Sequence, residues 1–244
     1  MPEIWVKPKD AEVLQAVKDA VGDLDTIEHE LLSGDRSYTT GDRARQNDHW
    51  GKRGATLKRL AEIEFLTDSG DWRTTLRLAQ QSYYQGLQVG GFRDHWLIGQ
   101  YVVLRSVVDE AFNLPRRNAD RWWFETCRAV GVGLASDNPE ERMWAWSSLA
   151  DLRLVALREG WTIEDAPAPG PVVPVGDLRQ MVSLVDGNGE CPALWPTFRQ
   201  FWRWRFWWTK DEARTGAAAA GYEFLWTLVR PMLDAPPSAP TATP

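Results

Sequence analysis

Apolar residues recur at helical spacing along most of this chain, and no window alternates apolar and polar residues for long enough to form a strand. Residues that commonly begin or end helices lie at the ends of these apolar stripes. Asp10 is a good N-cap for a heptad stripe that ends at Ser33-Gly34. The segment Ser136 to Glu141 combines a capping side chain, a proline at the first helical position and two acids in the first turn. The pattern predicts an all-α fold.

Composition divides the chain into five segments. Polar residues 35–47 predict a loop or short helix, and helices are expected over 53–66, 72–89, 196–210 and 211–233 among others. The run from Asp165 to Gly176 is rich in proline, so it predicts a semi-stiff connector. The predicted segments are an N-terminal amphipathic helix (1–34), helical-hairpin repeats (35–164), a proline-rich linker (165–176), a C-terminal helical segment (177–234) and a disordered tail (235–244).

Three of the expected helices share a pattern. Each carries a tryptophan followed, two turns later, by leucine, a basic residue and an apolar pair. The tryptophans are Trp50, Trp96 and Trp144, spaced by about 47 residues, a period typical of helical solenoids. We therefore expect the three indoles to occupy equivalent places in successive hairpins.

These repeats resemble the tetratricopeptide class. Ala79 and Tyr83 are similar to the small-then-aromatic pair of its second helix, and the stretch from Tyr83 to Trp96 also resembles the TRAFs-binding-type domains of bacterial signalling and conflict systems. The resemblance covers residues 50–160. It implies a short solenoid that binds another protein on its concave face. The candidate partner-binding residues are Tyr84, His95, Trp96, Tyr101, Trp144 and Trp146.

Sequence signatures of catalysis are missing. The chain has no G-x-S-x-G motif, P-loop or dinucleotide fingerprint. The three histidines are expected on separate helices or loops, and the two cysteines have no metal-binding spacing. The run from Asp186 to Glu190 imitates a calcium loop but lacks the required glycine and final glutamate. We expect no catalytic residues, no bound metal and no cofactor.

The charge and hydropathy patterns exclude two further classes. A net charge of −6 and a pI near 5.2 argue against general nucleic-acid binding, which requires a basic face. No apolar run approaches the roughly 20 residues that a membrane span needs. The N-terminus lacks the pattern of a signal peptide, so a cytoplasmic location is expected.

Tryptophan is unusually abundant. The chain has 15, more than its 8 phenylalanines and 5 tyrosines together. The densest stretch is Phe198 to Trp208 (FRQFWRWRFWW), which lies in a region with four basic residues and no acid between Leu194 and Lys210. A helix that is aromatic all round is normally buried, so we expect a packing core there. A surface for a protein partner, a membrane or a nucleic acid is the alternative.

Two functions remain open. The expected function is a non-enzymatic protein-binding scaffold or regulatory subunit, which the resemblance places in a bacterial signalling or defence system. The alternative is a sensor or enzyme that binds a small ligand, such as a sugar or nucleotide, in a tryptophan-lined helical cleft. Exposed tryptophans beside carboxylates in one deep cleft would favour the alternative, whereas buried tryptophans and a smooth apolar groove would favour the scaffold.

Overall fold

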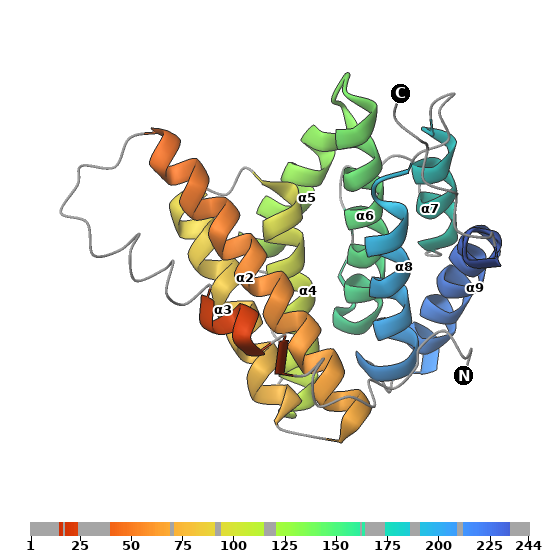
Figure 1. Ribbon diagram of the computed structural model, residues 1–244. Helices are drawn as coiled ribbons and strands as arrows, with labels where there is room; N and C mark the ends of the chain where they lie inside the picture. The colour runs from red at the N-terminus through yellow and green to blue at the C-terminus, as the bar shows by residue number, and fades with distance from the viewer. Residues whose placement is uncertain are drawn as a thin grey trace, which may run out of the picture.

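The computed structural model describes residues 15–16, 18–23, 40–68, 71–90, 94–114, 121–161, 163, 174–185, 191–208 and 212–234. Within these residues the secondary structure is helical and contains no strand, which confirms the all-α prediction. The labelled helices in Figure 1 are α2 (Thr40–Thr67), α3 (Trp72–Gly90), α4 (His95–Ala111), α5 (Arg121–Leu134), α6 (Pro139–Glu159), α7 (Pro174–Ser183), α8 (Leu194–Arg203), the π-helical turn η1 (Trp204–Trp208) and α9 (Glu212–Asp234).

Local capping signals fix several helix ends. The side chain of Asp94 accepts hydrogen bonds from the backbone N–H groups of Trp96 and Leu97, at 2.9 and 3.1 Å, and so begins α4. Asn138 caps α6, which begins at Pro139. Gly160 ends α6 in the left-handed conformation, with φ of 71°. The start of α6 agrees with the capping signal that the sequence shows between Ser136 and Glu141.

Helix α2 is longer than its composition suggests. The loop or short helix expected over residues 35–47 is wrong from residue 40 onward, because α2 begins at Thr40. Tertiary packing explains the difference. A Cβ on Gly90 of α3 would lie 2.7 Å from Asn47 Oδ1, and Trp50 is buried, so this polar stretch lies directly against α3. Trp50 therefore lies well inside α2, whereas Trp96 and Trp144 lie close to the starts of their helices.

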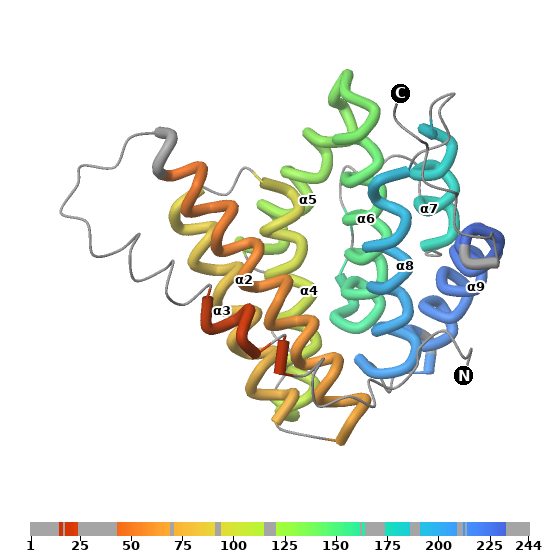
Figure 2. Tube along the Cα trace, viewed as in Figure 1, coloured from red at the N-terminus to blue at the C-terminus, as the bar shows by residue number. Residues whose placement is uncertain are grey.

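Neighbouring helices pack in chain order. Helix α2 packs against α3, α3 against α4, α4 against α5, α5 against α6 and α6 against α7, and α4 also contacts α6 (Figure 2). Helix α7 begins at Pro174, inside the segment expected to be a linker, while residues 164–173 and the tail lie outside the described residues. Of the predicted N-terminal helix, only residues 15–16 and 18–23 are described. None of the described helices is both long and apolar enough to cross a membrane.

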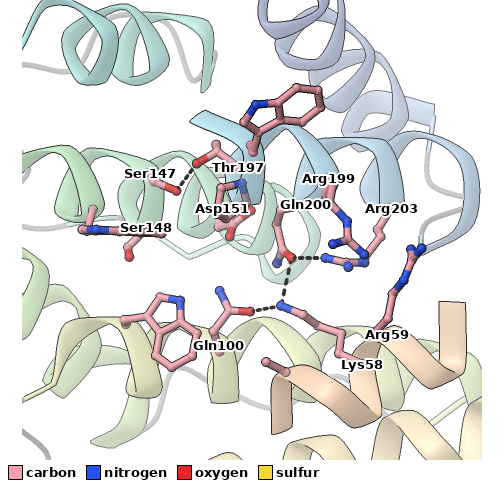
Figure 3. Close-up of a pocket in the computed structure, with 15 residues that line it drawn as sticks. Lys58, Arg59, Gln100, Ser147, Ser148, Asp151, Thr197, Arg199, Gln200 and Arg203 are labelled. Atoms are coloured by element: carbon pink, nitrogen blue, oxygen red, sulfur yellow. Dashed lines mark hydrogen bonds between the residues drawn. The ribbon is translucent and has the colours of Figure 1, made fainter. Parts of the chain in front are cut away.

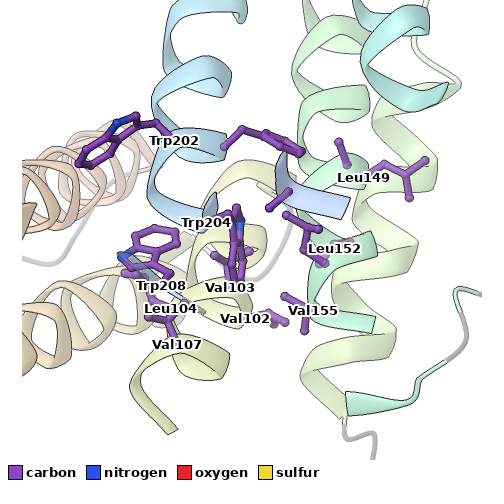
Figure 4. Packing of buried hydrophobic residues seen from close by; sticks show 14 of the residues in the cluster. Val102, Val103, Leu104, Val107, Leu149, Leu152, Val155, Trp202, Trp204 and Trp208 are labelled. Atoms are coloured by element: carbon purple, nitrogen blue, oxygen red, sulfur yellow. The ribbon is translucent and has the colours of Figure 1, made fainter. Parts of the chain in front are cut away.

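The tryptophan-rich segment is part of the core, as predicted. Phe198, Phe201, Trp202, Trp204, Trp207 and Trp208 are all less than 10 % exposed and belong to one cluster that draws on helices α2 to α9. Figure 4 shows Trp204 and Trp208 beside apolar side chains of α4 and α6.

The segment is also packed on two sides. Phe198 stacks on Tyr222 of α9 at 5.3 Å between ring centroids, while Trp207 stacks on Phe65 of α2 at 5.0 Å. A Cβ on Gly221 of α9 would lie 2.3 Å from the Phe201 ring, so only glycine permits this approach. Helix α8 and η1 are thus sandwiched between the earlier helices and α9, as the sequence predicted.

Candidate ligand-binding site

A cavity of about 340 Å³, lined by charged, amide and indole side chains, lies where α2, α4, α6 and α8 face one another (Figure 3). Helix α8 supplies Trp195, Arg199 and Arg203 at four-residue intervals, so these side chains share one face of the helix. Helix α2 supplies the adjacent Lys58 and Arg59. The cavity therefore collects cations from two helices that are far apart in sequence.

Three of these cations converge on one buried carboxylate. Arg203 donates from Nε and Nη2 to Glu62 Oε2, at 3.0 and 2.7 Å. Arg59 donates to Glu62 Oε1, and Arg199 Nη2 lies 3.5 Å from Oε2. Burial alone would raise the pKa of Glu62, but the three guanidinium charges outweigh it and hold that pKa below its ordinary value. Burial and the charge of Arg203 lower the pKa of Arg199 to about 10.

Lys58 lies deeper in the same cavity, held by two amide side chains. Its Nζ donates to Gln100 Oε1 at 2.5 Å and to Gln200 Oε1 at 3.2 Å (Figure 3). Arg203 Nη1 also donates to Gln200 Oε1, at 3.2 Å. Burial first, and then the charge of Arg203, lower the pKa of Lys58 well below its usual range.

Asp151 of α6 is the second carboxylate at the site. Trp204 Nε1 donates to its Oδ1 at 3.0 Å. Burial raises the pKa of Asp151 to about 7, although this hydrogen bond and the charge of Lys58 act against the rise. Three arginines and a lysine thus face two carboxylates, Glu62 and Asp151, so two positive charges are uncompensated. The net charge of these six side chains is the same whether Lys58 and Asp151 are both charged or both neutral.

Three indoles complete the wall. Trp195 is 39 % exposed, and Trp96 and Trp144 are partly buried. The ring of Trp96 lies against α2, where a Cβ on Gly51 would be 3.0 Å from it. Trp96 and Trp144 also line a second, more open cavity of about 470 Å³ together with His95, whose pKa is lowered by burial.

The structure places five of the six predicted site residues in two groups and Trp146 in neither. His95, Trp96 and Trp144 meet at the two cavities. Tyr84 and Tyr101 instead form an aromatic cluster with Trp122, with ring centroids 5.4 to 5.6 Å apart. Trp146 is partly buried and is not among the residues that line either cavity.

Sequence reasoning missed the charged half of the site. Lys58 occupies the basic position of the repeat pattern, and Arg199 and Arg203 belong to the acid-free run before Lys210. These two signals mark the cations. Nothing in the local sequence indicates that Glu62 and Asp151 face them.

Comparison with known proteins gave no match to a family model, to a curated protein or to a solved structure. Within the described part of the chain, no group of three or more histidine, cysteine, aspartate or glutamate side chains is arranged to hold a metal ion. The site is therefore characterised by its own charges, indoles and amides.

Proposed function

We propose that this protein binds a small anionic molecule in the cavity between α2, α4, α6 and α8. The observation that carries the proposal is the convergence of three arginines on the single buried carboxylate of Glu62, with Lys58 beside them. Arg203 is buried and paired with Glu62, whereas the side chains of Arg59 and Arg199 are 35 % exposed and line the cavity, where a ligand can meet them. A phosphate or carboxylate group in the cavity would supply the missing negative charge, and guanidinium groups bind such anions in a planar, bidentate way.

The remaining walls favour a ligand with a flat or sugar-like face. Indole rings, of which Trp195 is the most exposed, stack on nucleobases and on the apolar faces of sugars. A volume of about 340 Å³ suits a small molecule. The ligand class we propose is a mononucleotide or a sugar phosphate.

Titration calorimetry with adenosine monophosphate and glucose 6-phosphate tests the proposal. Arg199→Gln removes one cation at the cavity and should weaken binding of the preferred probe by about 10- to 100-fold, the usual worth of a hydrogen bond to a charged group. Arg128→Gln is the matched control. It makes the same charge change on α5, at an exposed pair with Glu125, and should leave binding unchanged.

Two results would contradict the proposal. One is the absence of binding by either probe or by inorganic phosphate. The other is an equal loss of affinity in Arg199→Gln and Arg128→Gln, because that would indicate attraction by overall charge and not by the cavity.

A second candidate is the protein-binding scaffold expected from the sequence. The stacking of α2–α3, α4–α5 and α6–α7 in chain order supports a tetratricopeptide-like array, and the cluster of Tyr84, Tyr101 and Trp122 favours a contact surface on it. Side chains of α8 already contact α2 and α6, so a partner would bind elsewhere on the array. Co-purification of a partner should be lost with Tyr84→Ser and retained with Arg199→Gln.

A further inference from the structure

Lys58 has an unusual environment for a buried lysine. Lysine is almost never fully buried unless it is paired with an opposite charge. Among the described residues, the hydrogen-bond partners of its Nζ are two neutral amide oxygens, and no carboxylate forms an ion pair with it. Tyr83 lies with its ring centroid 6.0 Å from Nζ, and burial raises the pKa of the Tyr83 hydroxyl, so this phenol remains uncharged.

The charged groups around Lys58 favour its neutral form. Burial and the positive charges of Arg203 and Arg199 disfavour the ammonium form of Lys58. The carboxylates of Asp151 and Glu62 favour that form less strongly, so the pKa of Lys58 is lowered. An unprotonated amine is a nucleophile toward carbonyl carbon. Lysines made reactive in this way lie in desolvated pockets or beside other cations, and Lys58 has both features.

We propose that Lys58 forms a reversible imine with a small aldehyde or ketone that carries a phosphate or carboxylate group. The inference rests on the proposed function, because the arginines would hold the anionic group of the ligand. Gln200 Oε1 accepts from both Lys58 Nζ and Arg203 Nη1, each at 3.2 Å, so these two nitrogen atoms lie at most about 6.4 Å apart. A ligand of about three carbons spans such a gap between its anionic and carbonyl ends.

Asp151 forms no ion pair with Lys58, so its carboxyl, protonated at the start, exchanges the protons that this reaction requires with the amine and the ligand through an intervening water molecule. The Nζ lone pair forms a bond to the carbonyl carbon, and an N–H proton passes through the Asp151 carboxyl to the oxygen, which gives a carbinolamine. Asp151 then protonates the hydroxyl group, which leaves as water with the electrons of its C–O bond. The resulting iminium returns its N–H proton to Asp151. The balance is one carbonyl and one amine consumed, one imine and one water formed, with no oxidant or reductant.

The experiment uses the full chain and two probes that differ only in the anionic group, glyceraldehyde 3-phosphate and glyceraldehyde. Imines are trapped with cyanoborohydride at pH 7, and labelled lysines are located by peptide mass spectrometry. Lys52 on the same helix is an internal reference, since it is 67 % exposed and paired with Asp48. An ordinary exposed lysine, with pKa of about 10.4, is neutral in roughly one molecule in 2500 at this pH.

We expect Lys58 to be labelled at least about ten-fold faster than Lys52, because burial and Arg203 lower its pKa and so raise the fraction of unprotonated amine at pH 7. The Asp151→Asn variant keeps an oxygen that accepts from the Trp204 indole but cannot transfer a proton. It should slow labelling of Lys58 without affecting Lys52.

The outcomes separate the two proposals. Equal labelling of Lys58 and Lys52, or no label on Lys58, overturns the imine proposal even if calorimetry shows phosphate binding. Preferential labelling of Lys58 by both probes at the same rate supports the reactive amine and contradicts the anion site. Preferential labelling that is faster with the phosphorylated probe, and that inorganic phosphate suppresses, supports both.

Discussion

Replacing Glu62 by glutamine should destabilise the protein far more than the same change at Glu64, two residues away on α2. The Glu62 side chain is fully buried and neutralises part of the charge of Arg203, Arg199 and Arg59. Removing one partner of a buried ion pair costs about 3–5 kcal/mol. Glutamine keeps a hydrogen-bond acceptor, so we expect the lower end, about 3 kcal/mol. At roughly 2–4 °C per kcal/mol for a chain of this length, Tm should fall by about 6–12 °C.

Glu64 is the matched control because its environment has the opposite effect. It accepts a hydrogen bond from Thr75 Oγ1 at 2.7 Å, and burial raises its pKa. Its protonated, neutral form is therefore favoured relative to solution, and Glu64→Gln should change the free energy of unfolding by no more than about 1 kcal/mol.

The two variants should also differ in their dependence on pH. The folded-state pKa of Glu62 is depressed, so its carboxylate stabilises the fold above its ordinary pKa of 4.5, and this contribution is lost as pH falls through the folded value. The folded-state pKa of Glu64 is raised, so its contribution is present below 4.5 and is lost as pH rises through the folded value. Thermal denaturation followed by circular dichroism between about pH 2 and 8 measures both effects. Equal losses of Tm in the two variants at pH 7 would refute the assignment of Glu62 as the counter-ion of the arginines.

Two further predictions concern the packing of α8 and η1. Gly221→Ala places a methyl group against the Phe201 ring and should lower the free energy of unfolding by about 2 kcal/mol, since an overpacking cost of about 3 kcal/mol exceeds a helix-propensity gain of about 1 kcal/mol. Gly216→Ala has open space around its Cβ and should raise the free energy of unfolding by about 0.5–1 kcal/mol. Chemical denaturation that ranks the two variants the other way would contradict the close approach of α9 to Phe201. Replacing Trp204 and Trp208 together by alanine should cost several kcal/mol, and an unchanged Tm would show that these rings do not form a core.

Local signals predicted much of the fold. Asp94 and Asn138 begin helices because their side chains satisfy backbone N–H groups within three residues, and Gly160 ends one because it adopts positive φ. The start of α2 could not be found in the same way. Its polar first turns are helical because Asn47 and Trp50 pack against α3. No signal in the local sequence indicates such a contact between helices.

The site was predictable only in its aromatic half. Trp96 and Trp144 stood out through their spacing, and both line the cavity. The charged half depends on pairs such as Glu62 with Arg203, which are 141 residues apart. Each member of such a pair looks like an ordinary surface charge in its own helix. Their burial becomes visible only when α8 is placed against α2.

This separation along the chain has a consequence for synthesis. Lys58 is held by Gln200, so the 142 residues from one to the other must be translated before the amine acquires that partner. Helices α2 to α6 can pair with their neighbours as they emerge from the ribosome, because most of their contacts with one another are between consecutive elements. Until α8 arrives, Glu62 and Lys58 remain hydrated side chains on an incomplete surface. A chain that stops before residue 194 would have the first helices of the fold and no cavity, so ligand binding would distinguish finished molecules from prematurely terminated ones.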